Sequence, residues 1–274
     1  MRILITNDDG IHSEGLRIAE GIAHEILGES EGEVYVVAPA SEQSGVSHAI
    51  SYHRPVNYAK ISDRRYVVEG TPADCVIIGV TSFMDEKPDL ILSGVNFGHN
   101  IAEDVIYSGT VGGAIQGTLQ GIRSIALSQA YKKQENHSGS AHRESGKECR
   151  GEASVWECSV AFGASVIRDL LSNNRGREWP VDGFYNVNFP AVSVEDAASA
   201  RFVAQGKRAQ GIMRAVREIN PNGKPVQWLV HDFDNDTAPK ETDCYLLSCG
   251  HITITPMHSD LTLMKTMKYL GEGL

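Results

Sequence analysis

Short apolar runs alternate, over the first 190 residues, with longer stretches in which apolar residues recur every three or four positions. The first run covers residues 3–5 and is followed by a helical pattern over 13–27. Similar runs lie at 33–39, 88–94, 122–128 and 182–190. Short continuous runs are typical of strands buried on both faces, and the wider spacing is typical of helices. The alternation predicts an α/β fold with a doubly wound, mostly parallel sheet.

The pattern changes twice along the chain. Residues 131–154 are polar, rich in Ser, Gly and charge, and without periodicity, which predicts an exposed insertion. From residue 199 onward polar and apolar residues alternate, which favours an antiparallel, β-rich arrangement. Ser259 and Asp260 are candidates to begin a helix at the C-terminus. We therefore expect a core over 1–190 and a β-rich extension with a terminal helix over 191–274, an arrangement often used in oligomers.

Composition narrows the class of protein. The 274 residues carry a formal net charge of −10, which argues against non-specific binding to nucleic acid. The five cysteines are odd in number and match no zinc-binding spacing, so we expect reduced thiols and a cytoplasmic protein. An aspartate pair interrupts the first apolar run too early for a signal peptide, and no apolar run is long enough to span a bilayer.

Two adjacent carboxylates stand where the first predicted strand ends. Asp8 and Asp9 precede Gly10, and the C-terminal ends of strands border the crevice where ligands bind in open α/β sheets. A turn or a helix cap would explain one aspartate but not two. Adjacent carboxylates repel each other and lose solvation when buried, and a bound cation removes both penalties. The pair therefore predicts a metal site.

The loops after later strands add neutral oxygen ligands and a possible anion site. Ser44 follows the second strand, and Asn96 follows the strand at 88–94. Carboxylate, hydroxyl and amide oxygens suit Mg²⁺, Mn²⁺ or Ca²⁺. Ser108, Gly109 and Thr110 begin a helix, where free N–H groups can bind phosphate, although an N-cap with glycines for close helix packing is by itself the better explanation. Together these residues predict metal-assisted hydrolysis of a phosphate ester.

Several of these motifs match a known family in their order along the chain. The matching segments are residues 3–10, 37–39 with 43–45, 70–75, 93–100, 107–111, 186–190, 242–243, 254–256 and 260–262. They extend over nearly the whole chain, which resembles the SurE family of survival proteins that act as 5′/3′-nucleotidases. The departure is the stretch 131–154, which is longer than the family pattern leads us to expect.

The resemblance implies roles for particular residues. Asp8, Asp9, Ser44 and Asn96 correspond to the ligands of one divalent cation per subunit, commonly Mn²⁺ or Mg²⁺. Asp8 and Asp9 are then also the catalytic candidates, and either a metal-bound water or one of these carboxylates attacks the phosphate. Asn7 and the segment Ser108, Gly109 and Thr110 are expected to bind the phosphate of the substrate.

The resemblance also implies an architecture and partners. The expected fold is a Rossmann-like core with a C-terminal extension that exchanges elements between subunits of a homodimer or homotetramer. Expected substrates are nucleoside monophosphates, and short polyphosphate for some members, with no nucleic-acid polymer and no membrane as partner. The preferred base and the choice between 5′- and 3′-phosphates stay open.

Two other functions compete with the nucleotidase hypothesis. The first is a nucleotide- or metal-binding protein without catalysis, which would show no turnover. The second is an acyl-transferring α/β hydrolase with Ser44 or Ser108 as its nucleophile. The chain lacks the Gly-x-Ser-x-Gly motif of that class, and resistance to chelators would be its signature.

Overall fold

A computed structural model describes residues 1–131, 155–172, 178–207, 213–231 and 239–263. The predicted insertion, apart from Tyr131, and most of the predicted C-terminal helix lie outside these residues. None of the described helices combines the length and apolar character that a membrane span needs.

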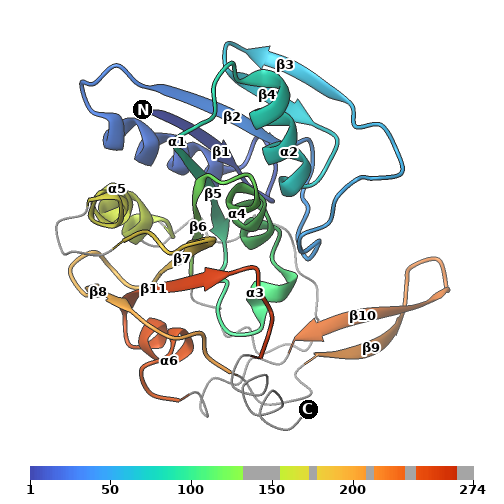
Figure 1. Cartoon of the computed structure of the whole chain (residues 1–274). Helices are drawn as coiled ribbons and strands as arrows, with labels where there is room; N and C mark the ends of the chain where they lie inside the picture. The colour runs from blue at the N-terminus through green and yellow to red at the C-terminus, as the bar shows by residue number, and fades with distance from the viewer. Residues whose placement is uncertain (132–154, 173–177, 208–212, 232–238, 264–274) are drawn as a thin grey trace, which may run out of the picture.

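One mixed sheet organises the molecule (Figure 1). Within the described residues it has nine strands in the order β3-β4-β2-β1-β5-β6-β7-β11-β8. The strands are β1 (Arg2–Thr6), β2 (Glu33–Pro39), β3 (Tyr58–Ser62), β4 (Arg65–Val68), β5 (Leu90–Phe97), β6 (Arg123–Gln129), β7 (Gly183–Phe189), β8 (Ala198–Phe202) and β11 (His251–His258). Strands β4, β2, β1, β5, β6 and β7 run parallel, so the predicted fold class is confirmed.

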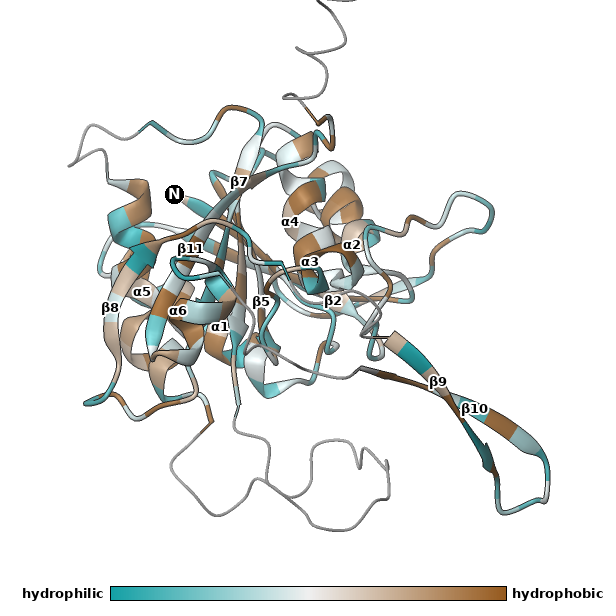
Figure 2. Ribbon diagram, turned by 90° about the horizontal axis from the view of Figure 1, so that it is seen from below, coloured by the Kyte–Doolittle hydropathy of each residue, from teal (hydrophilic) through white to brown (hydrophobic). Residues whose placement is uncertain are grey.

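Helices cover both faces of the sheet (Figure 2). Helices α1 (Glu14–Leu27) and α5 (Glu157–Leu171) lie on one face, and α2 (Pro72–Ile78) and α4 (Gly109–Leu119) lie on the other. The short elements are η1 (Gly79–Phe83), α3 (Asp104–Tyr107) and α6 (Asp243–Ser248), of which α6 packs against β11. The first strand shows why the early apolar runs are continuous. Ile3 and Ile5 join the cluster under α1, whereas Leu4 packs with Cys75 and Val76 of α2.

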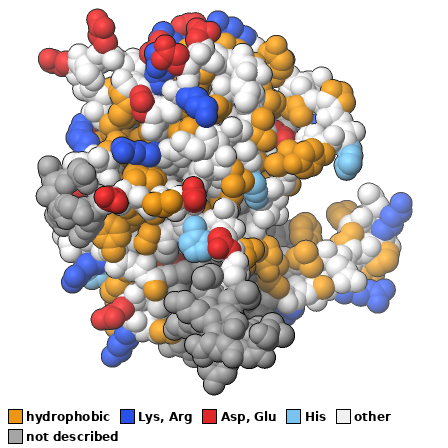
Figure 3. Space-filling view, viewed as in Figure 1, with side chains coloured by type: hydrophobic (Ala, Val, Ile, Leu, Met, Phe, Trp, Pro, Cys, Tyr) orange, Lys and Arg blue, Asp and Glu red, His pale blue; other side chains and the backbone are white. Residues whose placement is uncertain are grey.

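The residues after 190 divide between the sheet and a separate hairpin. Strand β11 pairs antiparallel with β7 and parallel with β8, so both belong to the main sheet. Strands β9 (Met213–Ile219) and β10 (Pro225–His231) form an antiparallel hairpin that extends away from the body, as expected for this region (Figure 1). Hydrophobic side chains line this hairpin, among them the exposed Trp228 and Leu229 (Figure 3). The strands β8 and β11 pair parallel, so the antiparallel prediction is wrong for this pair, and the division at residue 190 stays a prediction.

Candidate active site

The order of strands places the predicted site at a topological switch point. The chain passes from β1 to β2 on one side and returns to β5 on the other side of β1. Ligands of open α/β sheets bind beyond the carboxyl ends of the strands at such a point. Asp8 and Asp9 follow β1, Ser44 follows β2, and Asn96 lies at the end of β5. The fold therefore brings these three segments to the same edge of the sheet.

The turn after β1 is closed by the side chain of Asn7. Its Nδ2 donates to the carbonyl oxygen of Gly10 at 3.1 Å and to Ser13 Oγ at 2.7 Å. Gly10 has a φ of +98°, a conformation that glycine adopts without strain. Ser13 in turn caps α1 by accepting from the N–H of Leu16. The amide nitrogen of Asn7 is thus used within the turn, and a contact with phosphate stays a prediction.

Asp8 is buried against the start of α4. Its Oδ1 accepts a hydrogen bond of 2.5 Å from Thr110 Oγ1, and only 3% of the residue is exposed. A side chain at Gly109 would not fit, because its Cβ would lie 2.9 Å from the Cβ of Asp8. Burial raises the pKa of Asp8, and the hydroxyl and backbone N–H of Thr110 oppose the rise. The negative charge of Asp8 therefore faces the positive end of the α4 dipole.

The charge of Asp9 is compensated less strongly than that of Asp8. Burial, followed by the charge of Asp8, raises its pKa to about 7. The backbone N–H of Phe97 opposes the rise by donating to Oδ2 at 3.2 Å. Among the residues that the structure describes, no Lys, Arg or His forms an ion pair with Asp8 or Asp9. The pair therefore has the electrostatic character of a cation site.

The loop after β2 is attached to this pair through its backbone. The N–H of Gln43 donates to the carbonyl oxygen of Asp8 at 2.7 Å. Ser44 Oγ donates to Glu42 Oε1 at 2.8 Å, and the charge of Glu42 adds to the raised pKa of both aspartates. Glu42 is a carboxylate that the sequence analysis missed, although its position two residues before Ser44 was a usable signal.

An irregularity in β5 sets the position of Asn96. The pairing of β5 with β6 is interrupted after Ser93 and resumes at Asn96. Gly94, with a φ of +138°, packs so closely against β6 that a Cβ would lie 2.3 Å from the carbonyl oxygen of Leu127. Asn96 Nδ2 donates to the carbonyl oxygen of Gly98 at 2.9 Å. Because this bond uses the amide nitrogen, the carbonyl oxygen of Asn96 is the atom suited to bind a cation.

The start of α4 contains the other predicted phosphate ligands. Ser108 is the N-cap, because its Oγ accepts from the N–H of Val111 at 3.1 Å. Ser108, Gly109 and Thr110 are all buried. The capping role and the bond from Thr110 to Asp8 are therefore observed, whereas phosphate binding by this segment stays a prediction.

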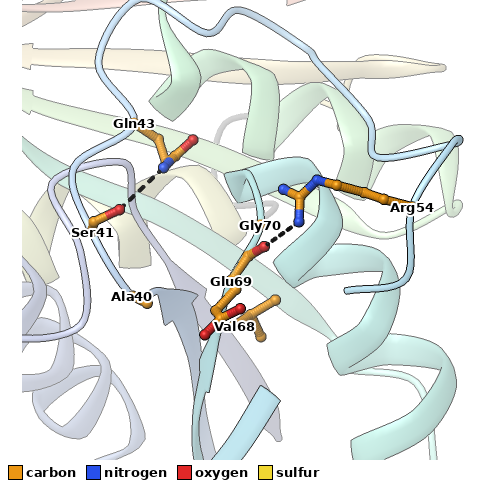
Figure 4. A pocket seen from close by; sticks show the side chains of 7 residues that line it. All are labelled: Ala40, Ser41, Gln43, Arg54, Val68, Glu69 and Gly70. Carbon is orange, nitrogen blue, oxygen red and sulfur yellow. Dashed lines mark hydrogen bonds between the residues drawn. The ribbon is translucent and has the colours of Figure 1, made fainter. Parts of the chain in front are cut away.

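A hollow opens at the ends of β2 and β4, beside the loop that carries Ser44 (Figure 4). Its volume is about 240 Å³, and it is lined by Ala40, Ser41, Gln43, Arg54, Val68, Glu69 and Gly70. Arg54 Nη1 donates to the carbonyl oxygen of Glu69 at 3.2 Å. Gln43 both lines the hollow and binds the backbone of Asp8, so the hollow adjoins the site.

The doubly wound sheet defines the chain as an α/β protein. Its candidate site lies beyond the carboxyl ends of the strands at the switch point, where open α/β sheets bind ligands. The family model described as "Survival protein SurE" matches residues 3–211. The chain belongs to the SurE family, and the resemblance inferred from the motifs is confirmed.

Proteins of this family are similar to the chain over nearly their full length. A "5′-nucleotidase SurE" of Parvibaculum lavamentivorans is 40% identical over 100% of this chain and 91% of its own length. A protein of the same name from Jannaschia sp. is 42% identical over 100% of both chains. The crystal structure of the SurE protein from Aquifex aeolicus superposes with a TM-score of 0.75, at 36% identity, and covers 99% of each chain.

Proposed function

We propose that this protein uses a divalent cation to hydrolyse nucleoside monophosphates to nucleoside and phosphate. It is a 5′-nucleotidase, a phosphoric monoester hydrolase, since curated relatives 40% to 44% identical over at least 96% of this chain carry that name. Cation dependence, activity on 3′-phosphates and cleavage of short polyphosphate are further parts of the proposal. A homodimer or homotetramer in the cytoplasm is the proposed form of the enzyme.

The observation that supports a bound cation is a pair of adjacent carboxylates, Asp8 buried and Asp9 half-buried, with raised pKa values and no ion pair within the described part of the chain. The residues that would hold it are Asp8, Asp9, Ser44 and Asn96. All four present oxygen atoms, which favour Mn²⁺ or Mg²⁺ over zinc. A cation bound there would supply charge that polarises a phosphate ester and acidifies water.

The chain's own groups prepare this site. Thr110 holds Asp8 in place through its hydroxyl, and Phe97 does the same for Asp9 through its backbone N–H. The N-terminus of α4, which begins at Gly109 beside Asp8, favours negative charge on a phosphate. The nucleophile is water or one of the two carboxylates.

The hollow beside Gln43 is the proposed place for the nucleoside. Its volume of about 240 Å³ and its mixed lining of Arg54, Gln43 and Val68 suit a ring with polar edges. We expect Arg54→Ala to raise KM for nucleoside monophosphates about three- to tenfold and to leave KM for p-nitrophenyl phosphate unchanged, since one lost polar contact costs about 1 kcal/mol. Equal effects on both substrates would contradict this placement.

The function is tested by phosphate release from 5′- and 3′-nucleoside monophosphates and tripolyphosphate, with Mn²⁺, with Mg²⁺ and with EDTA. We expect release that needs the cation and that disappears in Asp9→Ala. A folded protein that binds Mn²⁺ and releases no phosphate would instead be the binding protein considered above. Full activity in EDTA would contradict the requirement for a cation.

A further inference from the structure

The polar residues that mark the site continue sideways across the sheet. Asn96 of β5 lies opposite Ser128 of β6, Ser128 lies opposite Asn188 of β7, and Asn188 lies opposite Thr253 of β11. Asn186 and Thr255 form the next pair on the same face of β7 and β11. All of these residues except Asn96 are at most 3% exposed. A buried polar layer therefore connects the candidate ligand Asn96 with strands formed by the second half of the chain.

Three residues of this layer, Asn186, Asn188 and Ser128, bind a single loop residue, Asn100. The side-chain nitrogens of Asn186 and Asn188 donate to the carbonyl oxygen of Asn100 at 2.7 and 3.1 Å. The N–H of Asn100 donates to Asn188 Oδ1 at 2.8 Å, and its own Nδ2 donates to Ser128 Oγ at 2.9 Å. Both backbone groups of Asn100 are thereby satisfied by side chains of β7, in place of secondary structure.

A second attachment lies two residues further along the loop. The N–H of Ala102 donates to Asp243 Oδ2 at 3.1 Å, and Gln205 Nε2 donates to the carbonyl oxygen of Ala102 at 2.8 Å. Ala102 has a φ of +47°, which alanine rarely adopts, so these bonds hold the backbone in an uncommon conformation. Asp243 is itself fixed by the backbone N–H groups of Gly206 and Cys244.

The attached loop joins two parts of the candidate site. It leaves β5 after Phe97, the residue that follows Asn96, and reaches Ser108, the cap of α4. Gly98 lies between Asn96 and the attachment, and its carbonyl oxygen receives the hydrogen bond that orients the Asn96 amide. At the other end, the N–H of Ser108 donates to the carbonyl oxygen of Asp104. Displacement of Asn100 would therefore reach the Asn96 side chain through Gly98.

We propose that Asn186 and Asn188 are positioning residues for the phosphatase reaction, because their hold on Asn100 orients the Asn96 amide oxygen toward the cation site. The inference rests on the proposed function for its catalytic consequence. Its structural part, the fixing of the 98–107 segment by β7, stands without that function. Neither asparagine contacts the reacting atoms in this arrangement, so both act through the loop.

The test compares Asn188→Ala with two matched variants. Val187→Ala removes buried volume from the opposite face of β7, and Thr255→Val removes a buried hydroxyl that makes no hydrogen bond within the described residues. We expect Asn188→Ala to speed amide hydrogen exchange in 98–107 at least tenfold. It should also weaken Mn²⁺ binding, measured by calorimetry, and lower kcat, each about 10- to 100-fold, as for residues that orient metal ligands. Thr255→Val should leave all three unchanged, and Val187→Ala should lower Tm alone.

The outcomes separate this inference from the proposed function. Unchanged exchange and Mn²⁺ affinity in Asn188→Ala would overturn it, as would equal changes in Val187→Ala, which would indicate a general loss of stability. Should Asn188→Ala fail to fold, Asn186→Ala removes one donor from Asn100 and must show the same changes on a smaller scale. Effects on exchange and Mn²⁺ binding in a protein that releases no phosphate would support the positioning role and reject the nucleotidase.

Discussion

Asp243 and Asp8 are buried carboxylates and Asp9 is half-buried, but the environment of Asp243 differs from that of the Asp8–Asp9 pair. Asp243 accepts hydrogen bonds from the backbone N–H groups of Ala102, Gly206 and Cys244, which oppose the pKa rise caused by its burial. Asp8 accepts from the hydroxyl of Thr110 and Asp9 from the backbone N–H of Phe97, and the charge of Asp8 raises the pKa of Asp9 further. The comparison teaches that burial alone does not identify a binding carboxylate. The distinguishing property is charge that the chain itself leaves uncompensated.

The largest expected effect comes from one isosteric change in the pair. Asp8→Asn removes a charge from the proposed cation site but keeps an oxygen that can accept from Thr110. We expect phosphate release to fall at least about a hundredfold, because a charged cation ligand is lost. The Tm of the cation-free protein should stay the same or rise, since repulsion with Asp9 disappears. Colorimetric phosphate release and differential scanning calorimetry measure both, and a large fall in Tm would make Asp8 a structural residue.

The same change at Asp243 should lower stability rather than activity. In Asp243→Asn one oxygen becomes an NH₂ group, which cannot accept from the N–H groups of Ala102, Gly206 or Cys244. An unsatisfied buried donor costs about 1–3 kcal/mol, so we expect a loss of that size in the free energy of unfolding. Urea unfolding measures it, with Asp8→Asn as the matched control. Equal stability of the two variants would remove the distinction between the regions.

The candidate site could be predicted from the sequence, whereas the attachments made by Asn186 and Asp243 could not. Asp8, Asp9, Ser44 and Asn96 each stand at the end of an apolar run, so local pattern and fold class together placed them at one edge. The roles of Asn186 and Asp243 depend on partners 86 and 141 residues away in the chain. Local spacing carries no information about which strands become neighbours over such separations.

The alternation in β11 shows that polar positions of an alternating strand can also be buried. Ile252 and Ile254 pack in the main core, whereas Thr253 and Thr255 lie opposite Asn188 and Asn186. Alternating polar residues usually face water, and this pattern favoured an antiparallel, β-rich extension. Here the polar face of β11 is buried beside Asn186 and Asn188, and β11 pairs antiparallel with β7 in the main sheet.

The pH dependence of stability should show the titration of Asp9 directly. The pKa of Asp9 in the folded protein, about 7, lies above its ordinary value of 3.8, so folding favours the protonated form. This stabilisation is complete below pH 3.8 and is lost as the pH rises through about 7. We expect the Tm of the cation-free protein to fall between about pH 5 and pH 8, and Asp9→Asn to flatten this dependence. Identical slopes for the two proteins would show that Asp9 does not titrate in this range.

Added Mn²⁺ should oppose that fall. A cation binds the deprotonated carboxylates, so its stabilising effect should be larger at pH 8 than at pH 5, about 2.7 kcal/mol when its concentration is 100 times Kd. Mg²⁺ and a monovalent salt at equal ionic strength serve as controls. A stabilisation independent of pH would place the bound cation away from the pair.

The smallest expected effect comes from Glu42, whose charge acts on the Asp8–Asp9 pair without belonging to it. Its carboxylate is exposed, and it accepts a hydrogen bond from Ser44, a role that Gln at this position would keep. Glu42→Gln therefore removes charge alone. Loss of this charge lowers the pKa of Asp9 and so reduces competition from protons, but it also weakens attraction for a cation. A divalent ion feels the lost charge twice as strongly as a proton does, so the second effect prevails.

We therefore expect Glu42→Gln to raise the Kd for Mn²⁺ about two- to fivefold at low salt, since solvent screens an exposed charge. The difference should shrink at about 0.5 M salt, where screening is strong, whereas the loss caused by Asp8→Asn should persist. Calorimetric titration at the two salt concentrations measures both variants. A Glu42→Gln effect as large and as resistant to salt as that of Asp8→Asn would make Glu42 a direct ligand, and the cation site would then have three carboxylates.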